Sequence, residues 1–424
     1  MMGVRLVAAL ASATVLAISC ASPASPTNPP AGDAWPMYRG DLARDGHPRA
    51  ATLDAAGAAR LTLAWHAHLT GAIDGSPAVW SGKVIAGSEN GELAAFDEKA
   101  GAQLWIRTGL GPISGSPAID GNRVFAATLT GHVRAFDLDN GRDVWDWKAE
   151  GQQPALWSSP TIYDGLLLVG VGSQAGDTPL ETGSMVALDV VSGRERWTIC
   201  AIAGCQPGGG IWSTPSIDSA GRAYVGVGNP VDGVLAFDAR TGGRLWETSF
   251  YPDAGRDVDV GASPVLVDMG GREALAVGTV AGTLEMLDAR NGAIIWSVDL
   301  DAGSAVHGVI ATAAYDGVNL YVASASPPTG LFARKLDGSD VWTLQTFQPV
   351  YSAPSAGDGV VLFGTGAVFG DVNIGLILGL SRDDGKVLWS YDARSAVRSS
   401  PAIAGSLVVV GDAAGDLLAF DPGS

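Results

Sequence analysis

An internal repeat of roughly 40 to 50 residues constrains this chain more than any other feature. Each copy starts with Ser-Pro or a variant of it, continues through a short apolar run and a glycine-containing turn, and ends in Asp, a glycine turn and Trp. The starts lie at Ser76-Pro77, Ser116-Pro117, Ser159-Pro160, Thr214-Pro215, Ser263-Pro264, Ala353-Pro354 and Ser400-Pro401, with a degenerate start at Ala311-Thr312-Ala313. Repeats of this length are typical of solenoids and propellers.

The second half of the repeat has a fixed spacing. Asp stands eight residues before Trp in the pairs Asp97/Trp105, Asp137/Trp145, Asp189/Trp197, Asp238/Trp246 and Asp288/Trp296. A turn with glycine separates the members of each pair, which predicts a β-hairpin. The simplest role for the Trp is packing between neighbouring repeats, and the simplest role for the Asp is accepting backbone N–H groups in the turn. We interpret Asp337 and Trp342 as a shortened copy.

The two ends of the repeat region complement each other. The stretch from Leu61 to His68 contains Trp65 but has no Asp half before it, and Phe420-Asp421 has no Trp half after it. Pairing these two segments would close a ring and remove an exposed strand edge. The sequence therefore predicts an all-β, eight-bladed β-propeller of four-stranded antiparallel blades over residues 35–424, closed by the N-terminal strand.

Composition fits this fold and narrows the partners. The 58 glycines suit many tight turns. With 26 Lys and Arg against 44 Asp and Glu, the net charge of -18 disfavours binding to nucleic acid or to anionic lipid headgroups.

Residues 1–20 are predicted to be a targeting segment. Arg5 precedes a short apolar stretch that is too short for a spanning helix, and the stretch ends in Leu16-Ala17-Ile18-Ser19-Cys20, which resembles a bacterial lipobox. This predicts a lipid on Cys20, export, and a membrane contact through that lipid alone. Cleavage nearby, for instance after Ala24, is the alternative. Residues 21–34, rich in Pro, Ala and Ser, are expected to be a flexible tether.

Two further cysteines, Cys200 and Cys205, remain after Cys20. In an oxidising compartment they are candidates for a local disulfide. A zinc site is not expected from two cysteines without a nearby histidine.

The repeat, from Trp35-Pro-Met-Tyr-Arg-Gly-Asp onward, resembles that of the pyrroloquinoline-quinone (PQQ) repeat propellers. That resemblance implies one of two functions. One class comprises alcohol dehydrogenases that hold PQQ and Ca²⁺ at the mouth of the ring. The other comprises propellers without catalytic activity, BamB among them, that bind envelope proteins.

Three residues resemble site positions of the polyvinyl-alcohol-dehydrogenase branch. The resemblance implies that Trp212 is the floor under PQQ, that Asn229 and Asp259 are Ca²⁺ ligands, and that Asp259 is also the base that accepts the alcohol proton. Each of the three could instead serve the structure of the blades. Trp212, for example, occupies the same repeat position as Trp157. Asp259 breaks the repeat pattern most clearly, because Pro112, Ala155 and Ala396 stand at the matching positions.

Other positions depart from that branch. Val280 stands where the quinoproteins have Lys or Arg, and the acidic ligand of the metal has no clear match, with Asp177 and Glu181 as substitutes. The missing cation favours a non-catalytic envelope propeller that binds proteins or ligands. The alternative is a PQQ- and Ca²⁺-dependent alcohol dehydrogenase acting on a small alcohol.

Overall fold

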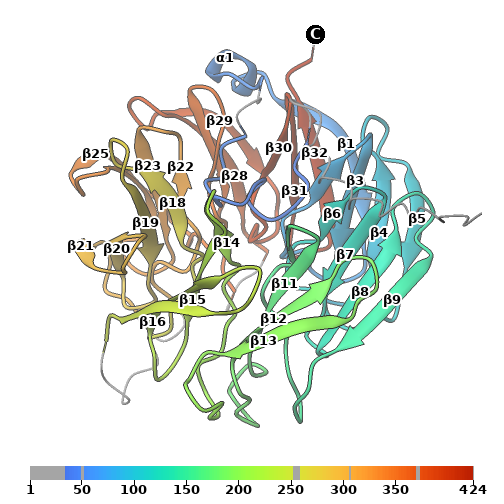
Figure 1. Cartoon of the computed structure of the whole chain (residues 1–424). Helices are drawn as coiled ribbons and strands as arrows, with labels where there is room; N and C mark the ends of the chain where they lie inside the picture. Colours follow the sequence, from blue (N-terminus) through green and yellow to red (C-terminus); the bar gives the residue numbers. More distant parts are fainter. Residues whose placement is uncertain (1–33, 49–51, 252–257, 305–306, 369–372, 424) are drawn as a thin grey trace, which may run out of the picture.

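The structure is a computed structural model, and it describes residues 34–48, 52–251, 258–304, 307–368 and 373–423. Within these residues, eight four-stranded antiparallel sheets form the blades of a propeller, and the one α-helix is the short α1 (Ala55–Ala58) (Figure 1). The eight-bladed prediction is confirmed.

In blades 1 to 7 the strands follow chain order from the innermost to the outermost, and in blade 8 β1 is the outermost strand. Blade 1 consists of β2 (Ala78–Trp80), β3 (Lys83–Gly87), β4 (Leu93–Asp97) and β5 (Gln103–Arg107), and blade 2 of β6 (Ala118–Asp120), β7 (Arg123–Ala127), β8 (His132–Asp137) and β9 (Asp143–Lys148). Blade 3 consists of β10 (Thr161–Tyr163), β11 (Leu166–Val171), β12 (Ser184–Asp189) and β13 (Glu195–Cys200), and blade 4 of β14 (Ser216–Ile217), β15 (Arg222–Val227), β16 (Gly233–Asp238) and β17 (Arg244–Ser249). Blade 5 consists of β18 (Val265–Asp268), β19 (Glu273–Gly278), β20 (Thr283–Asp288) and β21 (Ile294–Asp299), and blade 6 of β22 (Ala314–Tyr315), β23 (Asn319–Ser324), β24 (Gly330–Lys335) and β25 (Asp340–Gln345). Blade 7 consists of β26 (Ser355–Ala356), β27 (Val360–Gly364), β28 (Leu376–Ser381) and β29 (Val387–Asp392), and blade 8 of β30 (Ala402–Ala404), β31 (Leu407–Gly411), β32 (Asp416–Asp421) and β1 (Thr62–His68).

The ring closes where the two ends of the propeller meet. β1, coloured blue, pairs antiparallel with β32, coloured red, from Thr62 opposite Asp421 to His68 opposite Asp416 (Figure 1). The closing strand predicted from the sequence is therefore present. The pairing also covers the outer edge of β32, which would otherwise offer unpaired backbone groups.

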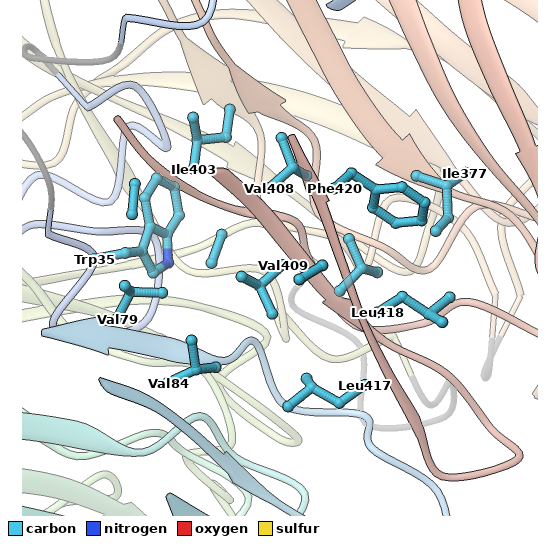
Figure 2. Packing of buried hydrophobic residues seen from close by; sticks show 14 of the residues in the cluster. Trp35, Val79, Val84, Ile377, Ile403, Val408, Val409, Leu417, Leu418 and Phe420 are labelled. Carbon is cyan, nitrogen blue, oxygen red and sulfur yellow. The ribbon is translucent and has the colours of Figure 1, made fainter. Parts of the chain in front are cut away.

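Burial follows the position of a strand within its blade. The second and third strands are almost entirely buried because neighbouring blades cover both faces, and they read as apolar runs such as Val84-Ile85-Ala86. The outermost strands alternate between exposed and partly buried residues, as in β17. One such interface, between blades 8 and 1, packs Val409 and Leu417 on the side of Val84 (Figure 2). Phe420, on the other face of β32, packs against Trp389 of blade 7.

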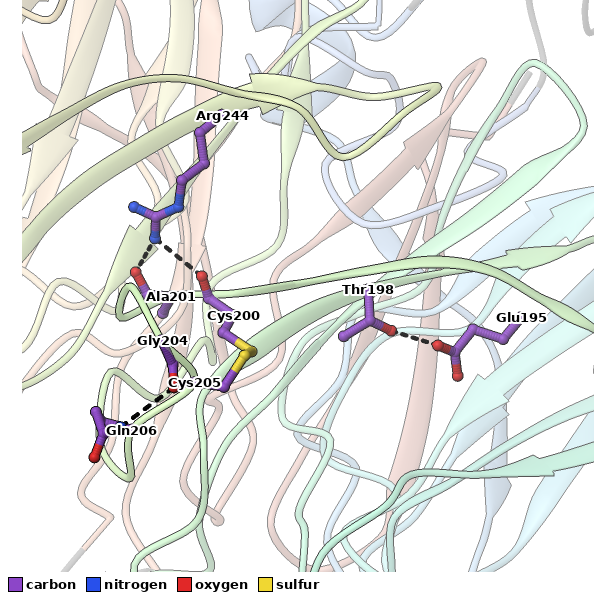
Figure 3. The surroundings of a disulfide bond; sticks show 8 residues. All are labelled: Glu195, Thr198, Cys200, Ala201, Gly204, Cys205, Gln206 and Arg244. Atoms are coloured by element: carbon purple, nitrogen blue, oxygen red, sulfur yellow. Dashed lines mark hydrogen bonds between the residues drawn. A yellow bond between two sulfur atoms is a disulfide. The ribbon is translucent and has the colours of Figure 1, made fainter.

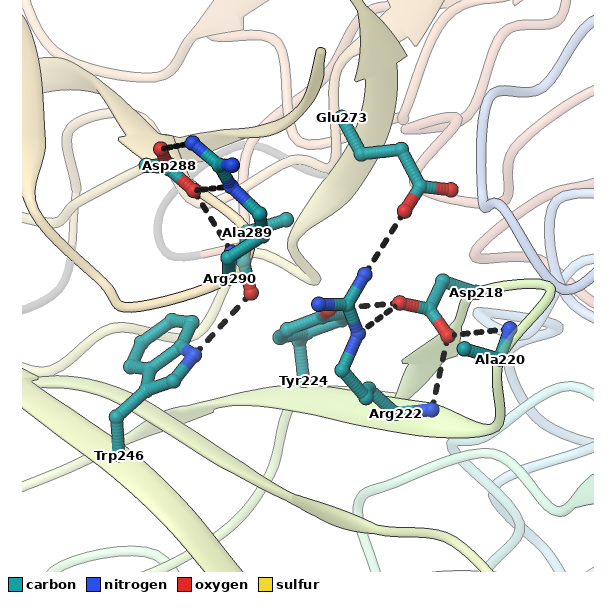
Figure 4. A network of polar contacts seen from close by, with 9 residues as sticks. All are labelled: Asp218, Ala220, Arg222, Tyr224, Trp246, Glu273, Asp288, Ala289 and Arg290. Carbon is teal, nitrogen blue, oxygen red and sulfur yellow. Dashed lines mark hydrogen bonds and ion pairs between the residues drawn. The ribbon is translucent and has the colours of Figure 1, made fainter.

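The recurring Trp joins seven blades to the next by an indole hydrogen bond, and in blade 3 Trp197 instead packs against Phe237 of blade 4 without such a bond. Trp246 in blade 4 donates its indole N–H to the carbonyl of Ala289 in blade 5 at 3.1 Å (Figure 4). Equivalent bonds of 2.8 to 3.1 Å run from Trp65, Trp105, Trp145, Trp296, Trp342 and Trp389. The predicted packing role of the Trp is confirmed.

The recurring Asp behaves as the turn acceptor that the sequence predicts, as where Asp97 accepts the N–H groups of Lys99 and Ala100. Blade 6 differs from the prediction. Lys335 ends the third strand there, and Asp337 lies inside the turn, accepting from Ser339. The turn of this blade is one residue shorter than in the other blades. Its carboxylate, Asp337, therefore lies within the turn, and Lys335 occupies the strand position that Asp has elsewhere.

The Ser-Pro starts have a role that the sequence reasoning missed. At six of the eight starts a hydroxyl accepts the backbone N–H of the start in the preceding blade at 2.8 to 3.1 Å, whereas the Ser76 hydroxyl donates to the carbonyl of Ser400 at 2.8 Å. These bonds run from Ser76 to Ser116, Ser116 to Ser159, Ser159 to Thr214, Thr214 to Ser263, Ser263 to Thr312 and Ala353 to Ser400. Because buried N–H groups need partners, this belt fixes the inner strands to one another around the axis.

Residues 35–47, here called the axial segment, run around the inside of the ring. Its backbone carbonyls accept N–H groups from the inner strands of six blades in turn. These bonds join Trp35 to Val79, Pro36 to Ile119, Leu42 to Ile217, Ala43 to Leu266, Asp45 to Tyr315 and Gly46 to Ala356. Trp35 is fully buried beside Val79 and Ile403 (Figure 2). The axial segment therefore fills one end of the central channel.

Candidate functional site

A cavity of about 1020 Å³ lies around the propeller axis, lined by the connections that lead into the inner strands and by turns of blades 3 to 5. A smaller cavity of about 180 Å³ shares part of its lining, and Tyr38 of the axial segment is among its walls. The larger cavity has the size that small-molecule sites usually have.

One residue from every blade contributes to the lining of the smaller cavity at the same repeat position, two residues before the Ser, Thr or Ala of the repeat start. These eight positions, here called the ring positions, are Asp74, Ser114, Trp157, Trp212, Gly261, Ile310, Tyr351 and Arg398, in the order of the blades. The repeat therefore delivers side chains from seven blades, and the glycine of blade 5, to one level of the axis. Trp157 and Trp212 do share a repeat position, as the sequence indicates.

Trp212 lies across the neighbouring ring position. A Cβ atom on Gly261 would stand 1.7 Å from the Trp212 ring, so the indole packs directly on a backbone without a side chain. Trp212 is half-buried and lines both cavities. This arrangement leaves a flat aromatic surface beside the larger cavity.

Asp259 and Asn229 complete this wall. The Asp259 carboxylate accepts the indole N–H of Trp212 at 3.0 Å through Oδ2 and the backbone N–H of Asn229 at 2.9 Å through Oδ1. Both residues line the larger cavity. Three residues from two blades, separated by up to 47 positions in sequence, thus form one contiguous group.

The fit of this group to a calcium ion is incomplete. Ca²⁺ usually takes 6 to 8 oxygen ligands, and in the described part of the chain no group of three or more His, Cys, Asp or Glu side chains is arranged to hold a metal. Of the two substitutes, Asp177 lines the cavity. The buried Glu181 instead accepts the backbone N–H of Gln153 at 2.6 Å.

Val280, the apolar residue that stands where the quinoproteins have Lys or Arg, is buried in the cavity lining.

The wall opposite Trp212 holds a cation, Arg398, that the sequence reasoning missed. Arg398 supplies a guanidinium from blade 8 and donates to Oδ1 of Asp74 through Nε at 2.9 Å and Nη2 at 2.8 Å. The signal was the repeat itself, because aligning the ring positions places Arg398 level with Trp212.

Carboxylates near Arg398 are shifted by their surroundings. Burial raises the pKa of Asp74, and the adjacent Arg398 partly offsets this. Burial likewise raises the pKa of Glu89, which accepts a hydrogen bond from Ser114. Tyr351, another ring residue, has its pKa raised to about 12 by burial and is hydrogen-bonded to His307. This wall is thus polar but poorly solvated.

A disulfide lies at the start of the connection between blades 3 and 4. Cys200 and Cys205 are joined, and Arg244 donates to the carbonyls of Cys200 at 2.9 Å and Ala201 (Figure 3). The same connection continues through Pro207 to Gly210 into the cavity lining. The covalent loop thus holds one rim of the cavity to the outer strands.

Cys20, the predicted lipidation site, lies outside the described residues, as does the apolar stretch before it. In the part of the chain that the structure does describe, no helix has the length and apolar character needed to cross a membrane.

A model of the family described as outer membrane protein assembly factor BamB matches residues 50–262 and 280–424. A polyvinylalcohol dehydrogenase from Pseudomonas sp. is 28% identical over 303 residues, which cover 56% of this chain and 47% of that relative, so the chain spans about half of that relative's length. The assembly factor BamB of Burkholderia pseudomallei (strain K96243) is 28% identical over 354 residues, or 82% of this chain and 84% of that protein. The solved structure of quinohemoprotein alcohol dehydrogenase from Comamonas testosteroni matches with a TM-score of 0.81 at 16% identity, over 94% of this chain and 82% of that one, which is a likeness of fold.

Proposed function

This chain belongs to the BamB-described family of PQQ-repeat propellers, and we propose that it is an exported alcohol dehydrogenase of the quinoprotein type. Its axial cavity would hold PQQ against Trp212, with Asp259 as the base. The observation that carries the proposal is the convergence of Trp212, Asn229 and Asp259 on one wall of that cavity.

The wall suits a flat, charged quinone. Trp212 rests on Gly261 and offers an extended aromatic surface, which favours stacking with a planar ligand. Arg398 provides a positive charge in the same cavity. For calcium the protein offers Asn229 and Asp259, which would leave most of the coordination shell to other donors.

The residues present define the protein's part in the chemistry. Asp259 would accept the proton of the alcohol hydroxyl as a general base. Its two N–H donors, from Trp212 and Asn229, hold the carboxylate in a fixed orientation at the edge of the indole. Bound PQQ supplies the electron-accepting quinone. Val280 and Ile310 contribute apolar lining that helps to exclude water from the reacting atoms.

A second candidate function is a non-catalytic propeller that binds envelope proteins, as the family description suggests. Two observations favour it. Val280 provides no charge where the dehydrogenases have one, and the described residues hold no cluster of three metal-binding side chains. In that case Trp212 and Asp259 would serve packing alone.

Titrating PQQ, with and without Ca²⁺, into the purified chain from residue 34 onward separates the two functions. A dehydrogenase shows saturable quenching of tryptophan fluorescence that Trp212→Ala weakens, and it oxidises an alcohol with an artificial electron acceptor. Asp259→Asn, which keeps an acceptor oxygen for the N–H groups of Trp212 and Asn229 but no basic carboxylate, should abolish turnover while the chain still folds and binds PQQ. Absence of binding at high micromolar PQQ would favour the protein-binding function, and envelope proteins would be the partners to test.

The proposed location is the cell envelope, with a lipid on Cys20 as the membrane anchor. The lipobox-like sequence supports it. Labelling cells with a fatty-acid probe should mark the wild-type chain in the membrane fraction and leave Cys20→Ala unlabelled in the soluble fraction. Equal fractionation of both forms would contradict the anchor.

A further inference from the structure

Arg398 differs from the other ring residues in carrying a positive charge. Among the eight ring positions, Asp74 and Arg398 carry the formal charges, and Trp157, Trp212, Ile310 and Tyr351 form an aromatic and apolar arc. An anionic ligand entering the cavity therefore meets its one cationic ring residue in blade 8.

The propeller's symmetry fixes where that charge lies. Trp212 belongs to blade 4 and Arg398 to blade 8, so four of the eight blade steps separate them in either direction. Because both occupy the same repeat position, they face each other across the axis at one level. A planar ligand that lies on Trp212 and extends across the cavity would direct its far edge toward blade 8.

The guanidinium has capacity to bind such an edge. Arg398 carries five N–H donors, and within the described chain its hydrogen bonds go to Oδ1 of Asp74. Its side chain is 15% exposed and lines both cavities. Asp74 therefore fixes the guanidinium in orientation and leaves other N–H groups able to pair with a carboxylate, the partner that Arg binds in a forked geometry.

From this geometry we infer that Arg398 is the carboxylate-binding residue of the cavity, with Asp74 as its positioning residue, and that the ligand is a flat aromatic polycarboxylate lying on Trp212. The inference rests on the proposed quinone site and assigns its anion contact to blade 8.

PQQ is the probe, and its affinity is measured by fluorescence quenching and calorimetry, without turnover. Arg398→Gln should raise Kd about 10- to 100-fold, because a charge-assisted bond to a carboxylate is lost. Arg398→Lys should recover part of that loss. Arg394→Gln is the matched control, since Arg394 is exposed on the same connection and lies outside the cavity lining.

Two further readouts separate binding from structural support. The trimethyl ester of PQQ should bind the wild type more weakly than the acid, and Arg398→Gln should lose that preference. Asp74→Asn keeps an acceptor for Arg398 but removes a negative charge beside the ligand, so it should tighten PQQ binding several-fold. A merely structural ion pair predicts weaker binding instead.

The outcomes distinguish this inference from the proposed function. If the wild type binds PQQ and Arg398→Gln binds equally well, the anion contact is elsewhere and the quinone site stands. If Arg398→Gln unfolds, the Asp74→Asn and ester comparisons decide. If the wild type binds neither PQQ nor a simple probe such as naphthalene dicarboxylate, both the inference and the quinone site are wrong.

Discussion

At the scale of single residues, function depends on small departures from an otherwise regular repeat. Glycine at ring position 261 is one of them, because it creates the space that Trp212 occupies. Asp412 is another. The Oδ1 atom of Asp412 accepts the backbone N–H groups of Ala414 and Asp416 in a turn of blade 8. At the matching position of blades 1, 2, 5 and 7, a hydroxyl accepts a backbone N–H group of its own turn, and these hydroxyls belong to Ser88, Thr128, Thr279 and Thr365 respectively.

Gly261→Ala should disrupt the proposed ligand platform. The new methyl group would lie within 2 Å of the Trp212 ring carbons, so the indole must leave its place. We expect PQQ affinity to fall about 10-fold or more, since stacking between aromatic groups is lost along with the fit. Gly243→Ala, in an exposed turn where a Cβ atom would meet only the end of the Thr241 side chain, at 3.3 Å, should bind like the wild type. Unchanged affinity in Gly261→Ala would rule out the platform.

Asp412→Thr should remove a pH-dependent loss of stability. Burial raises the pKa of Asp412 to about 6, so the folded state binds a proton more tightly than the unfolded state. The wild type should therefore lose stability as pH rises from about 4 to about 6, by at most about 3 kcal/mol, and then level off. Urea unfolding across this range should show the free energy of unfolding of Asp412→Thr, relative to that of the wild type, increasing as pH rises. Thr365→Ser should differ from the wild type by an amount that does not change with pH.

At the scale of elements, the axial segment connects the inner strands of successive blades. Its two arginines are fully buried, and their pKa values are lowered by that burial. Arg44 nevertheless keeps a pKa of about 10 and so stays charged at neutral pH. Its guanidinium donates to the carbonyls of Pro215, Tyr38 and Asp41 and to the hydroxyl of Thr161, at 2.6 to 2.9 Å. One side chain thus joins the segment to blades 3 and 4.

Arg44→Met should destabilise the whole propeller. Several charge-assisted hydrogen bonds, each worth about 1.5–3 kcal/mol, are lost, and buried carbonyls are left without donors. We expect the free energy of unfolding to fall by about 3 kcal/mol or more in urea titrations. Arg60→Met, at an exposed position, should change it by less than about 0.5 kcal/mol. A similarly small effect of Arg44→Met on the free energy of unfolding would mean that the axial segment binds inside the ring without stabilising it.

At the scale of the whole molecule, closure by β1 is what makes a ring of eight equivalent units into one body. Truncation tests this. A chain that begins at residue 52 keeps β1, and a chain that begins at residue 70 loses it. The first should keep the particle mass that the full chain has in solution, though it should be less stable because the axial segment is missing. The second exposes the edge of β32 and should form larger particles than the full chain, as seen by light scattering after gel filtration. Particles of the full chain's size from both would mean that closure does not depend on β1.

The sequence by itself determined the fold and most of one wall of the site. The repeat of Ser-Pro, Asp and Trp defined the blades and predicted the strand that closes the ring, because local turn chemistry and inter-blade packing are encoded at fixed spacings. The resemblance to the polyvinyl-alcohol-dehydrogenase branch pointed to Trp212, Asn229 and Asp259, and of these Asp259 also breaks the repeat pattern. The structure brings the three residues together.

Tertiary structure alone decided which distant residues share the axis. Asp74 and Arg398 are 324 positions apart, and nothing local in either stretch indicates that they pair. Ring closure sets them side by side and sets Arg398 opposite Trp212. The reason is geometric: a repeat specifies each blade's residues through short-range contacts, but what the residues at the axis form together depends on where the ring places every blade relative to the others.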